Sequence, residues 1–414
     1  MREYFLRRLL LTIPTFLGAT LLVFAIIQLA PGGPLEQQIM ALRMAMGGEA
    51  AGSGIAGQTG AMIPESALQE LRRYYGFDKP LLIRYLSWLG VWPREIESYI
   101  ATVGHIRNIG KGRQVLVQKT SEGRYHLLDP ATGRTLTGWH VEPQPSERGE
   151  ERVRIYRTGF SGILTGNFGT SYTYNEPVLQ LILQRLPISL QFGLIGFILS
   201  YSICIYLGIQ KALAHGSPFD LVSSTLVFIG YSIPGWALGA FLLMLFGTET
   251  FVALFPLGGF QSDHYAELSL VEKILDRAWH FVLPTIAYTV GSFATLTVLM
   301  KNALLENLSQ DYIRTAFAKG LPERRVIWLH ALRNSIIPIT ANIGYIIGLF
   351  LAGSYLIELV FNIDGVGKLS IDAVFARDYP IVFGFTVLAV LVRLFGAILS
   401  DLALALVDPR IRFK

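Results

Sequence analysis

Charged residues and cysteines are scarce in this sequence. Of the 414 residues, 52% are hydrophobic and only 16% are charged, whereas a soluble globular protein has about 25% charged residues. This deficit predicts a polytopic membrane protein. The one cysteine, Cys204, excludes an intrachain disulfide and any metal site built from several cysteines. Because Cys204 lies inside an apolar run, we interpret it as a small packing residue.

Motifs for catalysis and nucleotide binding are also missing. The string closest to a phosphate-binding loop, Gly110-Lys111-Gly112, lacks the first glycine at the required spacing and the hydroxyl residue. There is no His-Glu-x-x-His, no Gly-x-Ser-x-Gly and no zinc-type cluster. The sequence therefore predicts no enzymatic activity, no cofactor and no metal in this chain. The net charge of +5 is concentrated in particular loops, which fits membrane topology better than nucleic-acid binding.

Long apolar runs are what the sequence does contain. A bilayer span needs roughly 20 apolar residues. Six runs qualify, at about 9–29, 188–210, 221–247, 281–300, 336–360 and 381–407. Lysine and arginine gather before the first run, in 301–335 and at 408–414, which places these regions and both termini in the cytoplasm. The first run is too long for a signal peptide and is interpreted as a retained helix. The predicted fold is therefore an all-α polytopic membrane protein with six transmembrane helices.

Three parts follow from this pattern. Residues 1–30 form a tail and the first transmembrane helix, residues 31–187 an extracytoplasmic segment, and residues 188–414 the transmembrane core. Within the second part, residues 93–158 alternate β-forming and polar residues between turn signals. Its predicted strands cover 114–119, 124–128, 136–141 and 153–157. This pattern predicts a small antiparallel meander. Before it, residues 47–61 are typical of a flexible linker and residues 64–76 of an amphipathic helix.

The stretch 311–338 lies between two apolar runs and is the most informative part of the chain. Apolar residues recur at helical spacing and give one stripe, formed by Ile313, Ala316, Phe317 and Leu321. Gly320 ends this helix, and Pro322 suits the first turn of the next one. The loop is also basic, through Arg314, Lys319, Arg324, Arg325 and Arg333. A short amphipathic helix on a basic loop predicts a docking element for another protein.

These residues resemble the cytoplasmic coupling loop of permease subunits in binding-protein-dependent ABC importers. The general pattern of that family is Glu-Ala-Ala, three residues and then Gly. This chain has Arg314-Thr315-Ala316 and then Gly320, which is the variant of the dipeptide and oligopeptide branch. In the family, the short helix inserts into a groove of the ATP-hydrolysing subunit. The resemblance thus implies ATPase coupling by Arg314, Thr315, Ala316, Ala318, Lys319, Gly320 and Glu323.

The resemblance covers nearly the whole chain outside the meander. Matching strings include RRLLLTIPT at 7–15, GNFGTSY at 166–172, RLPISLQ at 185–191, ELVFNIDGVGKL at 358–369 and DPRIR at 408–412. Compact members run almost directly from Leu89 to Gly166, so the residues between are an insertion. Together with LAPGGP at 29–34, the insertion is most similar to the microcin C and oligopeptide sub-branch. Asp364 stands where the family usually has proline.

The resemblance implies a function and a set of partners. The chain forms part of a pathway for peptides or peptide-like solutes in the bacterial inner membrane. Its expected partners are a second homologous permease, two ATP-binding subunits, an extracytoplasmic substrate-binding protein and membrane lipid, and not nucleic acid. One alternative is a self-contained secondary transporter or channel, a class that usually shows internal repeats and intramembrane acids. Another is a membrane-anchored scaffold that acts through the insertion, which does not explain six spans and a coupling loop.

Arg393 is the candidate pathway residue, because it lies near the middle of the last apolar run. A buried arginine there costs at least about 2.5–3.5 kcal/mol unless it finds water or a partner. In the functional interpretation, Arg393 faces the pathway and attracts a carboxylate. In the structural interpretation, it pairs with Glu358 or Asp401 or extends toward the membrane surface.

Overall fold

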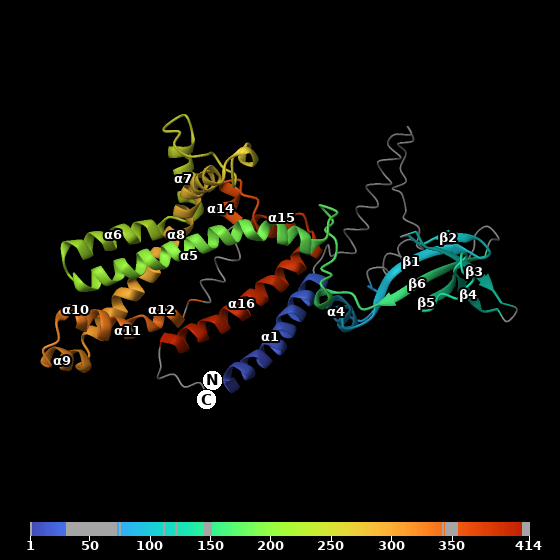
Figure 1. Ribbon diagram of the computed structural model, residues 1–414, viewed down its shortest axis with the longest axis horizontal. Coiled ribbons are helices and arrows are strands. Elements are labelled where there is room, and N and C mark those ends of the chain that lie inside the picture. The colour runs from blue at the N-terminus through green and yellow to red at the C-terminus, as the bar shows by residue number, and fades with distance from the viewer. Residues whose placement is uncertain are drawn as a thin grey trace. The chain divides into compact units, whose positions relative to one another are not determined.

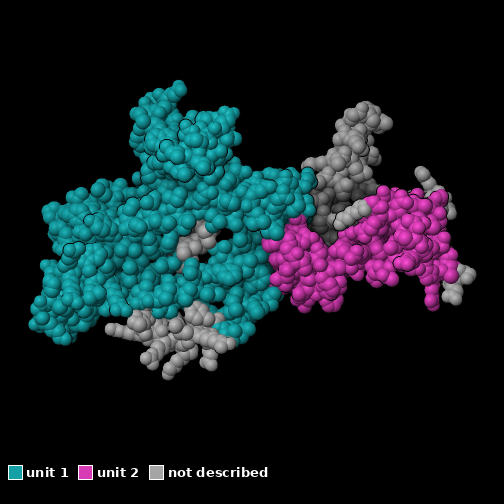
Figure 2. All heavy atoms as spheres, viewed as in Figure 1, with its two compact units in different colours: residues 1–23, 170–414 teal, residues 24–169 magenta. Residues whose placement is uncertain are grey.

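The computed structural model describes residues 2–29, 73, 76–110, 112–120, 123–144, 151–341, 343 and 355–407. The chain forms two compact units, which Figure 2 colours separately. We call residues 1–23 with 170–414 the helical unit and residues 24–169 the β unit.

Helices make up the helical unit and are labelled in Figure 1. The long ones are α1 (Arg2–Leu29, whose last turns belong to the β unit), α5 (Val178–Leu213), α6 (Pro218–Ser232), α7 (Gly235–Gly247), α8 (Leu270–Leu308) and α16 (Tyr379–Val407). The short ones are α9 (Asp311–Ala318), α10 (Glu323–Arg325), α11 (Leu332–Ser335), α12 (Ile337–Ala341), α14 (Tyr355–Val360) and α15 (Val366–Phe375). A π-helical turn, Val326–Ala331, joins α10 to α11.

Candidate membrane spans in the described residues agree only in part with the six predicted. Three helices are long and apolar enough, at Leu6–Leu29, Val178–Leu213 and Tyr379–Val407. Two bent pairs raise the number to as many as five: α6 with α7, bent by 96°, and Leu270–Gly291 with Phe293–Leu308, bent by 50°. Much of the remaining predicted span, 336–360, lies outside the described residues. The six-helix count therefore stays a prediction.

Several helices extend beyond the predicted apolar runs, and one run is interrupted. Helix α5 begins at Val178 rather than 188 and continues through Pro187. Helix α8 begins at Leu270 rather than 281, because a reciprocal capping box between Ser269 and Glu272 starts it earlier. It ends at Leu308, so the predicted loop 301–335 opens with helix. The predicted span 221–247 is interrupted at Pro234, which holds Ile233 in an extended conformation.

Two apolar cores stabilise the helical unit. The first joins α5, α8 and α9 with the residues up to α12 and includes Cys204, Met300 and Leu304, all fully buried. The burial of Cys204 agrees with its predicted packing role. The second core lies around Phe192, Phe281 and Phe361. The rings of Phe192 and Phe281 lie 4.1 Å apart.

Two three-stranded antiparallel sheets make up most of the β unit. The strands are β1 (Arg94–Thr102), β2 (Ile106–Asn108), β3 (Gln114–Lys119), β4 (Tyr125–Leu128), β5 (Trp139–Gln144) and β6 (Arg152–Gly159). One sheet has the order β2-β3-β4 and the other the order β1-β6-β5. The prediction of a single meander was thus wrong for the second sheet, because β1, which was not predicted, pairs with β6. The shared core has Val115, Val117, Val153 and Ile155 at its centre.

The chain enters and leaves this pair of sheets at one place. Helix α4 (Leu81–Leu89) comes before β1, and its C-cap residue Gly90 lies against Gly162, beyond β6. A Cβ atom on Gly162 would lie 2.7 Å from the carbonyl carbon of Leu89, so this crossing accepts only glycine. Beside it, Tyr85 and Trp88 of α4 contact the ring of Phe24 at the end of α1.

Candidate functional site

The predicted docking helix is α9. Its C-terminus is closed by a Schellman motif, in which Gly320 N donates to Phe317 O at 2.9 Å and Leu321 N donates to Ala316 O at 3.3 Å. Gly320 has φ = +75°, the left-handed conformation that this motif requires. The helix is also tied to α8, because the hydroxyl of Tyr312 donates to Asn307 Oδ1 at 2.8 Å. Helix α9 is therefore firmly placed at the end of α8.

The apolar stripe of α9 has a different use from the predicted one. Ile313 and Ala316 are buried in the core that α9 shares with α5 and α8, and Leu321 is partly buried beside them. Only Phe317 of the predicted stripe remains exposed, by 46%. The stripe thus mainly anchors the helix to its own chain. The residues that remain exposed here, which we call the coupling surface, are Tyr312, Arg314, Thr315, Phe317, Ala318 and Lys319.

Most of the predicted coupling residues lie on or near this surface. Arg314, Thr315, Ala318, Lys319, Gly320 and Glu323 are exposed, whereas Ala316 is buried. Two large apolar residues of the following turn, Trp328 and Leu329, are 48% and 53% exposed. They were not among the predicted residues, although apolar Ile327 and Ala331, which are buried, recur at the i, i+4 spacing of a helix.

A buried polar group lies where α5, α6 and α8 meet. Lys301 of α8 places its ammonium 2.7 Å from both carboxylate oxygens of Asp220, the third residue of α6. Lys211, near the end of α5, donates to Asp220 O, Ser223 Oγ and Ser224 Oγ at 3.1, 3.0 and 2.6 Å. We call Lys211, Asp220 and Lys301 the Asp220 cluster.

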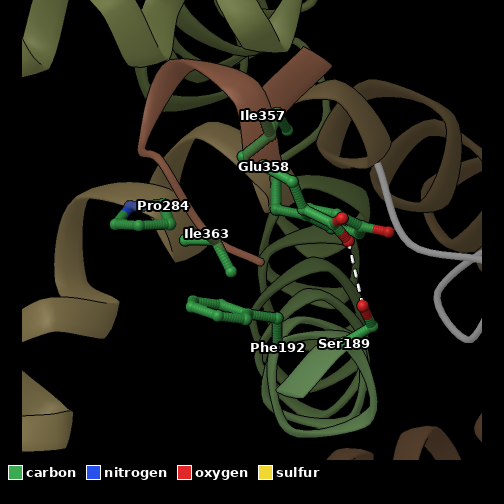
Figure 3. A pocket seen from close by; sticks show the side chains of 7 residues that line it. Ser189, Phe192, Pro284, Ile357, Glu358 and Ile363 are labelled. Carbon is green, nitrogen blue, oxygen red and sulfur yellow. Dashed lines mark hydrogen bonds between the residues drawn. The ribbon is translucent and has the colours of Figure 1, made fainter. Parts of the chain in front are cut away.

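A second buried carboxylate, that of Glu358, accepts hydrogen bonds from neutral groups. Glu358 of α14 accepts a hydrogen bond from Ser189 Oγ at 3.0 Å and from Lys368 N at 2.6 Å. Figure 3 shows the bond between Ser189 and Glu358 beside a small cavity. The cavity of about 10 Å³ has room for about one water molecule. We call Ser189, Glu358 and the loop Gly365–Gly367 the Glu358 knot.

Two further contacts join segments of the helical unit that are distant in the sequence. Arg185 pairs with Asp364 at 2.9 Å, so Asp364 anchors its loop to α5. Asp378, fully buried before α16, accepts from Ser171 Oγ at 2.6 Å and from Thr173 N at 3.0 Å. These contacts hold the segment before α5 against the turn between α15 and α16. Neither contact was predicted from the sequence.

Arg393 lies exposed on α16. Within the described residues, its side chain forms no hydrogen bond or ion pair. Its two suggested partners are engaged elsewhere, since Asp401 pairs with Arg8 and Glu358 belongs to the knot. The structure thus gives no support to the structural pairing, and the pathway role stays a prediction. Over the same residues, no three His, Cys, Asp or Glu side chains come together in a way that could hold a metal ion.

Comparison with known proteins identifies the family. Residues 204–413 match the family described as the binding-protein-dependent transport system inner membrane component. The chain belongs to this family. It is therefore a multi-pass permease of the bacterial inner membrane, and the resemblance drawn from residues 311–338 is confirmed.

Relatives match along the entire chain. The peptidoglycan transport system permease protein YejB of Agrobacterium fabrum strain C58 is 34% identical over 100% of this chain and 99% of its own length. The inner membrane ABC transporter permease protein YejB of Escherichia coli O157:H7 is 32% identical, and the oligopeptide transport system permease protein AppB of Bacillus subtilis strain 168 is 29% identical, each over 100% of both chains. A chain of the MetNI methionine ABC transporter in an inward-facing conformation aligns with a TM-score of 0.41 and 14% identity, over 56% of this chain and 97% of its own.

Proposed function

We propose that this permease forms one half of an ABC importer pathway for peptides or peptide-like solutes, driven by separate ATPase subunits. The observation that carries the proposal is the match over the full length to permeases named for peptidoglycan and oligopeptide transport. The sequence has no phosphate-binding motif of its own, which supports an ATPase on other chains. The other half of the pathway would come from a second homologous permease, and a binding protein would deliver the solute.

The coupling surface fits the role of the ATPase contact. Phe317 offers an exposed ring, and Arg314 and Lys319 add positive charge on either side of it. Ile313 and Ala316 fix the same helix to the core of the helical unit, so a force applied to α9 reaches α5 and α8. ATP binding would then favour one arrangement of the pathway through differential contacts at α9. Arg314, Thr315, Ala318, Lys319, Gly320 and Glu323 would contact or shape the interface, and Ala316 would act by packing.

Substitution of Phe317 tests this contact. Phe317→Asp places a charge in the proposed interface and should abolish both co-purification with the ATPase subunits and solute-stimulated ATP hydrolysis. Phe251→Asp is the matched control, because Phe251 is exposed to a similar degree, 55%, in the loop that follows α7 and not on α9. Retention of the ATPase by Phe317→Asp would contradict the assignment. If the wild-type chain co-purified without any ATPase, a self-contained secondary transporter would be the better interpretation.

The topology that this function requires places both termini and residues 301–335 in the cytoplasm and residues 31–187 outside. The distribution of lysine and arginine supports it. In a Cys204→Ser background, an impermeant thiol reagent added from outside should label Gln118→Cys, an exposed position of β3, and should not label Ser309→Cys after α8. The reverse pattern would place α9 on the wrong side of the membrane for an ATPase.

The β unit and Arg393 complete the proposal. We infer that strands β1–β6 contact the binding protein or shape the pathway entrance. Because Gly90 lies against Gly162, a chain that joins Leu89 to Gly162 through a short linker tests this role. Import at the wild-type rate, with the wild-type dependence on binding-protein concentration, would show that the unit has neither role. Arg393→Gln should weaken import of peptides with a free C-terminal carboxylate more than import of amidated peptides, if Arg393 attracts that carboxylate.

A further inference from the structure

The attachment of α6 to the rest of the chain is unusual. Asp220 is the one buried residue of α6. The large apolar residues that follow it are more than half exposed, at Leu221, Val222, Leu226, Phe228 and Ile229. Near its other end, Gly230 lies close to Val290 of α8. Helix α6 is thus attached to α8 by an ionic contact near its first turn and by close backbone packing, with little burial of apolar side chains.

The two lysines of the Asp220 cluster have different tasks. Lys211 finds three oxygen acceptors within the α5–α6 region, Asp220 O, Ser223 Oγ and Ser224 Oγ. These match the three donors of an ammonium group. The carboxylate of Asp220 also accepts from Gly216 N at 3.2 Å, so the turn between α5 and α6 is closed by its own groups. Lys301 adds the contact from α8, at 2.7 Å to each carboxylate oxygen.

Lys301 lies on the same rigid stretch as the coupling surface. Helix α8 continues from Phe293 to Leu308, and Gln310 O accepts from Ile313 N at the start of α9. Met300, the neighbour of Lys301, is fully buried in the core that contains Ile313 and Ala316. We call residues 293–318 the coupling arm. A displacement of α9 must therefore displace Lys301.

We propose that Lys301 and Asp220 are a positioning pair, which makes the start of α6 follow the coupling arm, so that movement at the ATPase reaches the bent span formed by α6 and α7. This inference rests on the proposed function. The 96° bend between Ser232 and Gly235 then turns a movement of α6 into a movement of α7. The ionic contact serves this purpose because it ties the start of α6 to Lys301 of the coupling arm.

Lys301→Met tests the pair without leaving an unbalanced charge. In this variant, Lys211 remains 3.4 Å from the carboxylate of Asp220 as its counter-ion. The buried carboxylate is therefore still paired with one ammonium group. In proteoliposomes with the ATPase subunits and the binding protein, we expect solute imported per ATP hydrolysed to fall by about two- to thirty-fold. ATP hydrolysis itself should persist, because the coupling surface is intact. Lys301→Arg should restore most of the import, since its guanidinium can still reach the carboxylate.

The controls separate this proposal from a purely structural role. Lys273→Met removes a lysine from the other end of α8, which donates to Ala266 O, and should leave the import per ATP unchanged. If Lys301→Met also retained the wild-type ratio, or if import and hydrolysis fell together through loss of assembled complex, the positioning pair would be refuted. A wild-type complex without solute-stimulated hydrolysis would instead refute the proposed function.

A distance measurement gives a second test that does not depend on import. Spin labels at Leu221→Cys of α6 and Asp311→Cys, an exposed position at the start of α9 outside the coupling surface, in a Cys204→Ser background, report whether the two helices move together. In the complex with Lys301 present, the distance distribution should be the same without nucleotide and with trapped ATP. In Lys301→Met it should shift or broaden between the two states. A shift of equal size with Lys301 present would overturn the inference.

Discussion

The Asp220 cluster and the Glu358 knot both bury a carboxylate in the helical unit, but they hold it by different means. The ammonium groups of Lys301 and Lys211 lie 2.7 and 3.4 Å from the carboxylate oxygens of Asp220. The carboxylate of Glu358 accepts instead from a serine hydroxyl and a backbone N–H. The first arrangement depends on charge. The second depends on how closely the backbone of 365–367 can approach the carboxylate.

This difference predicts which substitutions each region tolerates. At the knot, Cβ atoms on Gly365 and Gly367 would lie 2.6 and 3.1 Å from a carboxylate oxygen of Glu358. The knot should therefore be sensitive to added volume. The Asp220 cluster should be sensitive to the loss of a charge at constant volume, because burying an unpaired ion is costly.

Asp220→Asn should have the largest effect. It keeps the shape of the side chain but leaves Lys211 and Lys301 without a counter-ion. Removing one partner of a buried ion pair costs about 3–5 kcal/mol, which should appear as a large drop in the thermal unfolding midpoint of the permease in detergent. The double variant Asp220→Asn with Lys301→Met should recover part of the loss. A midpoint within one or two degrees of wild type for the single variant would show that the cluster is not held by charge.

Gly365→Ala should have the next largest effect, through volume alone. Its Cβ would lie 2.5 Å from Ser189 Oγ and 2.6 Å from Glu358, and overpacking of this kind costs about 1–3 kcal/mol. Gly18→Ala is the control, since no atom lies within 4 Å of the added Cβ. The thermal midpoint of Gly365→Ala should rise again when Ser189→Ala is added, because that substitution makes room. Equal midpoints for Gly365→Ala and Gly18→Ala would contradict the account of the knot.

The sequence predicted these two regions unequally. The loop at 358–369 was found only as a matching string, since the packing of glycine around a carboxylate has no local signal. Asp220 and Lys301 were not connected, because a contact between residues 81 positions apart leaves no periodic pattern. By contrast, α9 and its end at Gly320 were predicted closely, because helical spacing and C-capping are local properties.

The sheets of the β unit repeat this lesson. The predicted runs 114–119 and 124–128 coincide with β3 and β4 or nearly so, and these pair as neighbours in sequence. Strand β1 was missed, because its partner β6 lies at the other end of the unit. Likewise, the periodicity of α9 identified its apolar stripe but not which protein covers it. Burial against α5 and α8 decides that question, and it depends on tertiary structure.

Gly320→Ala should have a smaller effect than either buried substitution. No atom lies within 4 Å of the added Cβ, so volume costs nothing here. The cost comes from φ = +75°, and a left-handed conformation costs a residue with a Cβ about 1–2 kcal/mol. Coupled ATP hydrolysis should fall modestly, and Gly320→Asn should lie closer to wild type because asparagine tolerates this conformation. If alanine and asparagine behaved alike, backbone conformation would not be what Gly320 contributes.

Glu151 of the β unit provides the exposed counterpart of both buried carboxylates, and its substitution should have the smallest effect. Hydrogen bonds from Lys119 and from the hydroxyl of Tyr125, the latter at 2.6 Å, lower the pKa of Glu151. Because its folded-state pKa is lowered, the ionised carboxylate of Glu151 stabilises the unit at pH values above the unfolded-state pKa, about 4.3. This contribution is lost as the pH falls through the folded-state pKa. The hydrogen bond to Glu151 also raises the pKa of Lys119. The contribution of the Lys119 ammonium to stability is therefore present below about pH 10.4, the unfolded-state pKa, and is lost as the pH rises through the folded-state pKa.

Between these two pH limits, the hydrogen-exchange protection of β3 and β4 should be slightly greater in wild type than in Glu151→Gln. The ratio of the two protections, in which the intrinsic pH dependence cancels, should approach one as the pH falls through the lowered folded-state pKa of Glu151 and should shrink in about 1 M salt. A ratio that stayed constant with pH and salt would mean that Glu151 stabilises the unit by packing. The difference between exposed Glu151 and the buried carboxylates would then not be a difference in the strength of charge interactions.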